Sequence, residues 1–154
     1  MNPRGLTGPE RELTLSPLLQ SGVGDEALCR RAVAECLLIS FQHRLPPVFQ
    51  GIRPLIAYGA LNSTARGITL GRRIYIRHDA FDTTGGLPPY LLVHELAHVV
   101  QFLRDGTPRF LTRYLTEYFA GIPRYGSTRE AYLNISYEIE ARQVETFLPE
   151  HLQR

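Results

Sequence analysis

The stretch LLVHELAHVVQF, Leu91–Phe102, places two histidines and one glutamate in a run that is otherwise almost entirely apolar. A helix that is apolar nearly all round is a buried helix. Burying two imidazoles and a carboxylate without partners would cost a large amount of free energy. We therefore expect these side chains to share a ligand; the alternative is a pair of core histidines bonded to neighbouring protein groups.

The spacing of these three residues indicates which ligand. In a helix, His94 and His98 differ by roughly 40° in angle and 6 Å in rise, so their side chains point the same way. Two imidazole nitrogens can then bind one zinc ion. Glu95 lies about 60° around the helix from His98, within reach of a water at the ion. This is the HExxH arrangement of zinc hydrolases, and a shuffled chain of this composition shows it only about 1% of the time.

Prolines, glycines and alternating patterns predict the elements before this helix. Residues 1–23 are rich in Gly, Pro and polar residues, which predicts a flexible N-terminal arm. Residues 25–44 have helical periodicity. Residues 52–60 and 65–70 are predicted as strands joined by a loop. Arg73–Arg77 alternates polar and apolar residues, which predicts a half-exposed strand at a sheet edge.

Other boundaries follow the motif. Pro88 and Pro89 suit the first turn of its helix, and Gly106 suits the end. Further helices are predicted over 109–120, stopped by a glycine and a proline, after a capping box at 127–130, and over 137–147. The pattern predicts an α+β fold with an N-terminal helix, a small antiparallel or mixed sheet and C-terminal helices. Residues 24–154 are expected to form one domain.

Composition excludes several classes of function. The chain has 154 residues and a net charge of +2, too small to predict a nucleic-acid or membrane partner. All 17 basic residues are arginines, which excludes lysine chemistry such as a Schiff base. Cys29 and Cys36 are expected to be reduced core residues. Because no secretory signal is recognisable, we expect a cytoplasmic protein, with export by a non-classical route as the alternative.

A family resemblance extends the motif. The segment from Ile68 to Phe102, ITLGRRIYIRHDAFDTTGGLPPYLLVHELAHVVQF, resembles the zincin-type core domain of proteins linked to extracellular contractile injection systems. The similarity lies in a Thr-hydrophobic-Gly strand turn, a second strand, an acidic-aromatic loop and the Leu-Leu-x-His-Glu-Leu-x-His-Val-Val-Gln helix. It implies a zincin-like fold, with an edge strand over the metal-binding helix.

The third metal ligand is implied by a more distant resemblance to gluzincin-type metallopeptidases, which use a glutamate on a later helix in a Glu-x-x-Ala-Asp or Glu-x-x-Ala-Asn pattern. Glu138-Ile139-Glu140-Ala141-Arg142 fits this frame, which implies Glu138. Arg142 departs from it, so the acceptor that would orient a histidine is either missing or supplied by another residue. Glu140 is the second candidate, and the two glutamates cannot both face the metal because two residues along a helix turn a side chain by about 200°. The remaining candidates are Glu117, Glu130, His43, His78 and His151, and the last alternative is a site with no third protein ligand.

These observations predict a zinc metalloendopeptidase acting on a peptide or protein, with Glu95 as the general base. The substrate would pair with the strand that contains Arg73 and Tyr75. Candidate donors to the oxyanion are Tyr132 and Tyr137, followed by Tyr118 and Arg142. The competing prediction is a non-catalytic zinc-binding or docking domain of a larger secretion or toxin assembly.

Overall fold

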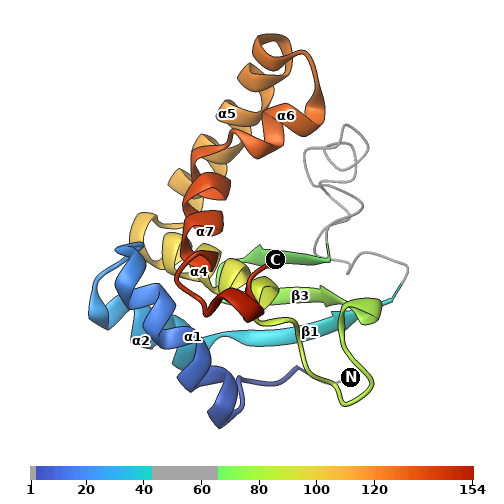
Figure 1. The fold of residues 1–154 in the computed structure, drawn as a ribbon. Coiled ribbons are helices and arrows are strands. Elements are labelled where there is room, and N and C mark those ends of the chain that lie inside the picture. Colours follow the sequence, from blue (N-terminus) through green and yellow to red (C-terminus); the bar gives the residue numbers. More distant parts are fainter. Residues whose placement is uncertain (1–2, 43–65) are drawn as a thin grey trace.

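The structure is a computed structural model that describes residues 3–42 and 66–154 (Figure 1). Within these residues it is an α+β fold of six α-helices and a three-stranded mixed sheet, as predicted. The predicted strand over 52–60, the loop after it and His43 lie outside the described residues. The elements are α1 Gly8–Ser21, α2 Glu26–Glu35, β1 Leu37–Phe41, β2 Gly67–Leu70, β3 Arg73–Arg77, α4 Pro89–Asp105, α5 Thr107–Tyr125, α6 Thr128–Leu133 and α7 Ser136–Glu145, with 3-10 turns at His78–Ala80 and Glu150–Leu152.

The sheet has the order β1-β3-β2, so β3 is its central strand. The prediction that Arg73–Arg77 forms an edge strand is therefore wrong. β1 pairs with β3 in parallel and β2 pairs with it antiparallel. Ile74 and Ile76 are fully buried and Tyr75 is nearly so. With a strand on each side, β3 has no edge to offer a substrate, so neither Arg73 nor Tyr75 can bind one by strand pairing.

β1 comes from a segment that was predicted to be helical. The predicted helix over 25–44 stops at Glu35, and Cys36 is already extended, with φ −66° and ψ 149°. Apolar and β-branched residues follow it in LLISF, and these favour a strand once a partner is available. Cys29 and Cys36 are both buried and free, as predicted.

The N-terminal arm predicted for residues 1–23 is instead largely helix α1. Thr7 caps this helix and forms a reciprocal capping box with Glu10. Pro9 lies in the first turn, where proline is tolerated, so it does not disrupt the helix. Leu18 is completely buried. The prediction was wrong because it rested on the Gly and Pro content, whereas the capping motif of Thr7 and Glu10 starts a helix.

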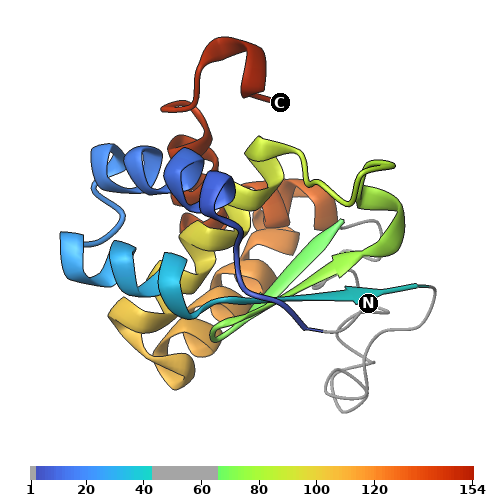
Figure 2. The same cartoon turned by 90° about the horizontal axis from the view of Figure 1, so that it is seen from below.

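α4 lies at the centre of the fold. α1, α2 and α7 pack against it, and it also contacts β2 and β3. Figure 2 shows α1 and α2 (blue) gathered at one side of α4 (yellow). Every residue from Leu91 to Phe102 is buried, which confirms the interpretation of this stretch as a core helix. Gly106, at φ +80°, ends α4 as predicted. No helix within 3–42 or 66–154 has the length and apolar character needed to cross a membrane.

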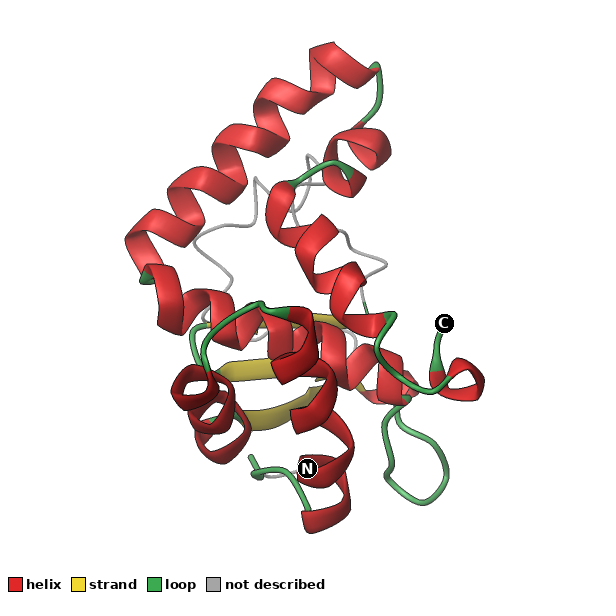
Figure 3. Ribbon diagram, turned by 60° about the vertical axis from the view of Figure 1, so that its left-hand side comes forward, coloured by secondary structure: helices red, strands yellow, loops and turns green. Residues whose placement is uncertain are grey.

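α5 and α6 extend away from the sheet, and α7 returns towards it (Figure 3). α5 was predicted to stop at Gly121, but it continues to Tyr125. Gly121 allows α5 and α6 to pack closely, because a Cβ at this position would lie only 3.0 Å from the Cβ of Ala131 on α6. Ser127 caps α6 as predicted, by accepting a bond from the backbone N–H of Glu130.

Candidate metal centre

Three buried donors converge between α4 and α7. The ligand atoms of His94, His98 and Glu138 all lie within 4.8 Å of one another. Their side chains are only 3–8% exposed. α4 contributes the two histidines one helical turn apart, and α7 brings Glu138 against them. The structure thus joins the HExxH histidines with the glutamate implied by the gluzincin resemblance, and these three residues could hold a metal ion.

A carboxylate on α7 orients His94. His94 Nδ1 lies 2.8 Å from Glu145 Oε1. An ionised carboxylate only accepts hydrogen bonds, so Nδ1 donates and the lone pair is left on Nε2. Glu145 thus supplies the acceptor that Arg142 could not provide. Sequence analysis missed it, although Glu145 follows Glu138 by seven residues, or about two turns, and therefore lies on the same helix face.

An amide on α4 orients His98 in the same way. His98 Nδ1 lies 2.7 Å from Gln101 Oε1. The Gln101 amide nitrogen donates to Tyr137 O at 3.0 Å and to Glu140 Oε2 at 2.8 Å, which fixes the amide orientation. His98 Nδ1 is then the donor and Nε2 carries the lone pair. Glu140 is therefore not a metal ligand in this arrangement. It accepts a hydrogen bond from Gln101, which in turn orients His98.

The two Nε2 atoms face the carboxylate of Glu138. The distance from His94 Nε2 to Glu138 Oε2 is 3.2 Å, and from His98 Nε2 to Oε1 it is 3.3 Å. A neutral imidazole nitrogen and a carboxylate oxygen both accept hydrogen bonds, so a positive charge has to lie between them. Protons on the imidazoles or a shared metal cation would meet this need. Two imidazoles and one carboxylate form a donor set of the kind that binds catalytic zinc.

Electrostatics in the metal-free state show the same demand for positive charge. Burial lowers the pKa of His94, but hydrogen bonds to Glu138 and Glu145 outweigh it and raise the pKa to about 10. Burial raises the pKa of Glu138, but the charges of and bonds to the two histidines bring it well below its usual range. The site therefore favours an ionised Glu138 together with a positively charged neighbour.

Two tyrosine hydroxyls complete the surroundings of Glu138. Tyr114 on α5 donates to Oε1 at 2.8 Å, and Tyr132 on α6 donates to Oε2 at 2.9 Å. Burial and the charge of Glu138 raise the pKa of both phenols, which keeps them protonated as donors. Sequence analysis selected Tyr132 but missed Tyr114, whose position in the α5 helical pattern resembles that of an ordinary core residue.

The other oxyanion candidates lie elsewhere. Tyr137 donates to Asp105 Oδ2 at 2.7 Å, and its ring stacks on Phe110. Arg142 donates to the carbonyl of Leu133, which joins α7 to the end of α6. Tyr118 is fully buried in the aromatic cluster that joins α5, α6 and α7. Glu117 accepts bonds from Ser136 at the start of α7, so it has a structural role.

Glu95, the predicted general base, is 4% exposed and contacts β2. Its Oε2 accepts a 2.7 Å hydrogen bond from Thr69 Oγ1. The charge of Glu95 also contributes to the raised pKa of His94 and of His98. Its carboxylate is therefore close enough to act electrostatically on both histidines without joining the donor set.

Removing the acceptor that orients His94 is expected to weaken metal binding. Glu145→Ala leaves His94 Nδ1–H without its carboxylate and frees the ring to turn. We expect zinc affinity to fall about 10–100-fold, the usual effect of losing such a partner. Competition titration with a chromophoric chelator measures this change. Glu150→Ala removes an exposed carboxylate nearby and should leave affinity unchanged. Equal affinities in the two variants would contradict the role of Glu145.

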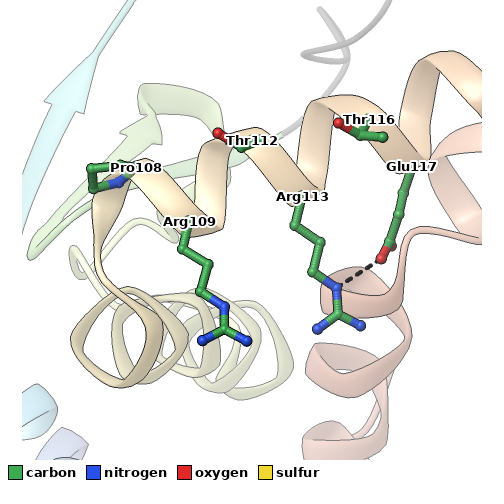
Figure 4. Close-up of a pocket in the computed structure, with 6 residues that line it drawn as sticks. All are labelled: Pro108, Arg109, Thr112, Arg113, Thr116 and Glu117. Atoms are coloured by element: carbon green, nitrogen blue, oxygen red, sulfur yellow. Dashed lines mark hydrogen bonds and ion pairs between the residues drawn. The ribbon is translucent and has the colours of Figure 1, made fainter.

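A separate groove runs along the exposed face of α5 (Figure 4). Two of its lining residues, Arg113 and Glu117, form an ion pair at 2.8 Å. None of the metal donors lines this groove, so it is not part of the candidate centre. The lining residues are Pro108, Arg109, Thr112, Arg113, Thr116 and Glu117.

Comparison with known families agrees with part of this picture. No curated protein and no solved structure shows significant similarity to the chain. Residues 57–106 match a sequence family described as the eCIS core domain. The match includes β2, β3 and α4, and therefore Thr69, the two histidines and Glu95. This finding supports the resemblance to proteins associated with extracellular contractile injection systems. Over the segment that carries the HExxH helix, the chain is similar to the eCIS core domain.

Proposed function

We propose that this protein is a zinc-dependent metallopeptidase. The observation that carries the proposal is the convergence of His94, His98 and Glu138 from two helices, with Glu95 beside them. Both histidines present Nε2 because their Nδ1 atoms are held by Glu145 and Gln101. Three protein ligands and a neighbouring carboxylate are what a zinc hydrolase requires.

Each residue has a chemical role in this proposal. His94, His98 and Glu138 would hold the zinc ion, which when bound supplies Lewis-acid activation of water and of the substrate carbonyl. Glu95 accepts the proton from the attacking water and delivers it to the leaving amine. Tyr132 or Tyr114, both donors beside Glu138, would stabilise negative charge that develops on the carbonyl oxygen.

The proposed substrate is a peptide or protein bound in extended form along β2. This strand lies against α4, and its Thr69 donates a hydrogen bond to Glu95. Among the strands within 3–42 and 66–154, β2 pairs on one side only. An extended segment could therefore add to its other edge by main-chain hydrogen bonds, alongside the strand that contacts Glu95.

The test combines metal content with turnover. We expect about one zinc per chain by mass spectrometry of the purified protein. We also expect cleavage of a mixed peptide library that a chelator stops and zinc restores. A protein that takes up no zinc on reconstitution would contradict the metal centre. One zinc per chain without cleavage of any peptide would contradict the peptidase.

The second candidate is a non-catalytic zinc-binding or docking domain of a larger secretion or toxin assembly. The burial of all three donors and the engagement of both Glu138 oxygens by tyrosines favour it, since such a closed arrangement suits a structural metal site. For this second candidate, we expect bound zinc to raise the thermal stability of the fold, and we expect no peptide cleavage that a chelator can stop.

A further inference from the structure

Glu95 lies against the face of β2 that meets α4. Thr69 Oγ1 is 2.7 Å from Glu95 Oε2 and 3.2 Å from the backbone oxygen of the same residue. A hydroxyl has a single hydrogen, and the shorter contact to a charged acceptor is the stronger bond. Thr69 therefore donates to the carboxylate, across 26 residues of sequence.

Gly67 gives the carboxylate room on the same face of the strand, two residues before Thr69. A Cβ built on Gly67 would lie 2.6 Å from Glu95 Oε1 and 2.8 Å from Cδ. Such distances are shorter than any real Cβ contact, so a side chain here would displace the carboxylate. Both oxygens of Glu95 thus lie against β2. Oε2 accepts a hydrogen bond from Thr69, and Oε1 occupies the space that a side chain at Gly67 would fill.

Thr69 is also the main polar support of this carboxylate. Glu95 forms no ion pair in the described part of the chain, and the Thr69 hydroxyl is the one donor found there for its side chain. A glutamate has three rotatable side-chain bonds, and a general base has to stay within about 3 Å of the proton that it takes. An anchor on a strand restricts the side chain to one position.

We propose that Thr69 is the positioning residue for Glu95, and that Gly67 provides the space in which Thr69 holds the carboxylate. The catalytic consequence rests on the proposed peptidase function, whereas the placement of Glu95 does not. Because Thr69 contacts no metal donor, its removal should affect turnover without affecting zinc.

The experiment compares Thr69→Val, Thr69→Ser and Gly67→Ala with the wild type, all as full-length, zinc-loaded protein. We expect Thr69→Val to lower kcat about 10–100-fold, with KM and zinc affinity unchanged. Thr69→Ser keeps the hydroxyl and should recover most of kcat. Gly67→Ala should lower kcat by displacing the carboxylate sterically. Thr112→Val, on the exposed face of α5, is the matched control and should behave as the wild type.

Crystal structures of zinc-loaded wild type and Thr69→Val give a readout that needs no activity. We expect Glu95 to leave β2 or to lose defined density in the variant. A Glu95 carboxylate that stays in place in Thr69→Val would overturn the proposal, as would an unchanged kcat in an active enzyme. If the wild type cleaves nothing but Glu95 moves in Thr69→Val, the peptidase fails and the positioning role of Thr69 stands.

Discussion

Glu95→Gln is expected to abolish peptide hydrolysis while the protein keeps its zinc. The substitution preserves the size of the side chain, and its amide oxygen can still accept the bond from Thr69. It removes the only function that the proposed mechanism assigns to Glu95, which is to accept a proton from water. We expect kcat to fall about 10²–10⁴-fold, the contribution of a positioned general base. Steady-state kinetics on a cleaved library peptide measure the loss, and mass spectrometry measures zinc in the same sample.

Glu12→Gln, a carboxylate on the exposed face of α1, is the matched control and should retain full activity. The metal measurement separates the two ways in which Glu95→Gln could fail. Lost activity with zinc retained is the expected result and agrees with a general base. Lost zinc would make Glu95 part of the metal centre. Wild-type rates in the variant would show that another group, or none, takes the proton.

Glu138→Ala and His98→Ala are expected to lose zinc almost completely. Each removes one of three buried donors and leaves charged or polar partners without their ion. Zinc content should fall from about one per chain to near zero after dialysis, since the remaining two protein ligands bind zinc far more weakly. The rise in thermal midpoint on adding zinc, which a ligand specific for the folded state produces, should disappear as well.

Glu140→Ala is the decisive comparison for this site. Glu140 was the second candidate ligand from the sequence, but its carboxylate contacts Gln101 and Arg104. The variant should therefore keep about one zinc per chain, with at most the moderate loss of affinity expected for a group behind a ligand. Zinc lost in Glu140→Ala but retained in Glu138→Ala would reverse the assignment. Circular dichroism of the zinc-free proteins checks that each variant is folded.

Much of the centre could be predicted from local sequence. His94, Glu95 and His98 lie within five residues, and helical geometry alone places their side chains. The ends of α4 were also predictable, because Pro89 and Gly106 act within one turn of the chain. Glu138 required more than local pattern, since 40 residues separate it from His98. It was reached through a family resemblance, and the structure brings it to the two histidines.

Predictions failed where a distant segment determines the outcome. LLISF follows a helical pattern in isolation, but it becomes β1 because β3 offers a backbone to pair with. The same pairing places β3 at the centre of the sheet. The strand that forms an edge and contacts Glu95 is therefore β2. The prediction of a flexible arm over 1–23 failed for another reason: it rested on glycine and proline content, although the capping signal of Thr7 and Glu10 is local.

The partners of the metal donors show where sequence information ends. Thr69 and Gln101 belong to the pattern that carries the family resemblance, and Glu145 shares a helix face with Glu138, but no local pattern assigns a hydrogen-bond partner to any of them or to Tyr114. The sequence by itself determined that His94, His98 and Glu95 lie together on one helix, because i to i+4 geometry depends only on the backbone. Only the tertiary structure decided the third donor's surroundings, the tautomers of both histidines and the strand that holds Glu95. Those features depend on hydrogen bonds between different elements, such as the bond from Thr69 to Glu95 and the bond from His94 to Glu145, which form only when packing brings α5, α6, α7 and β2 around α4.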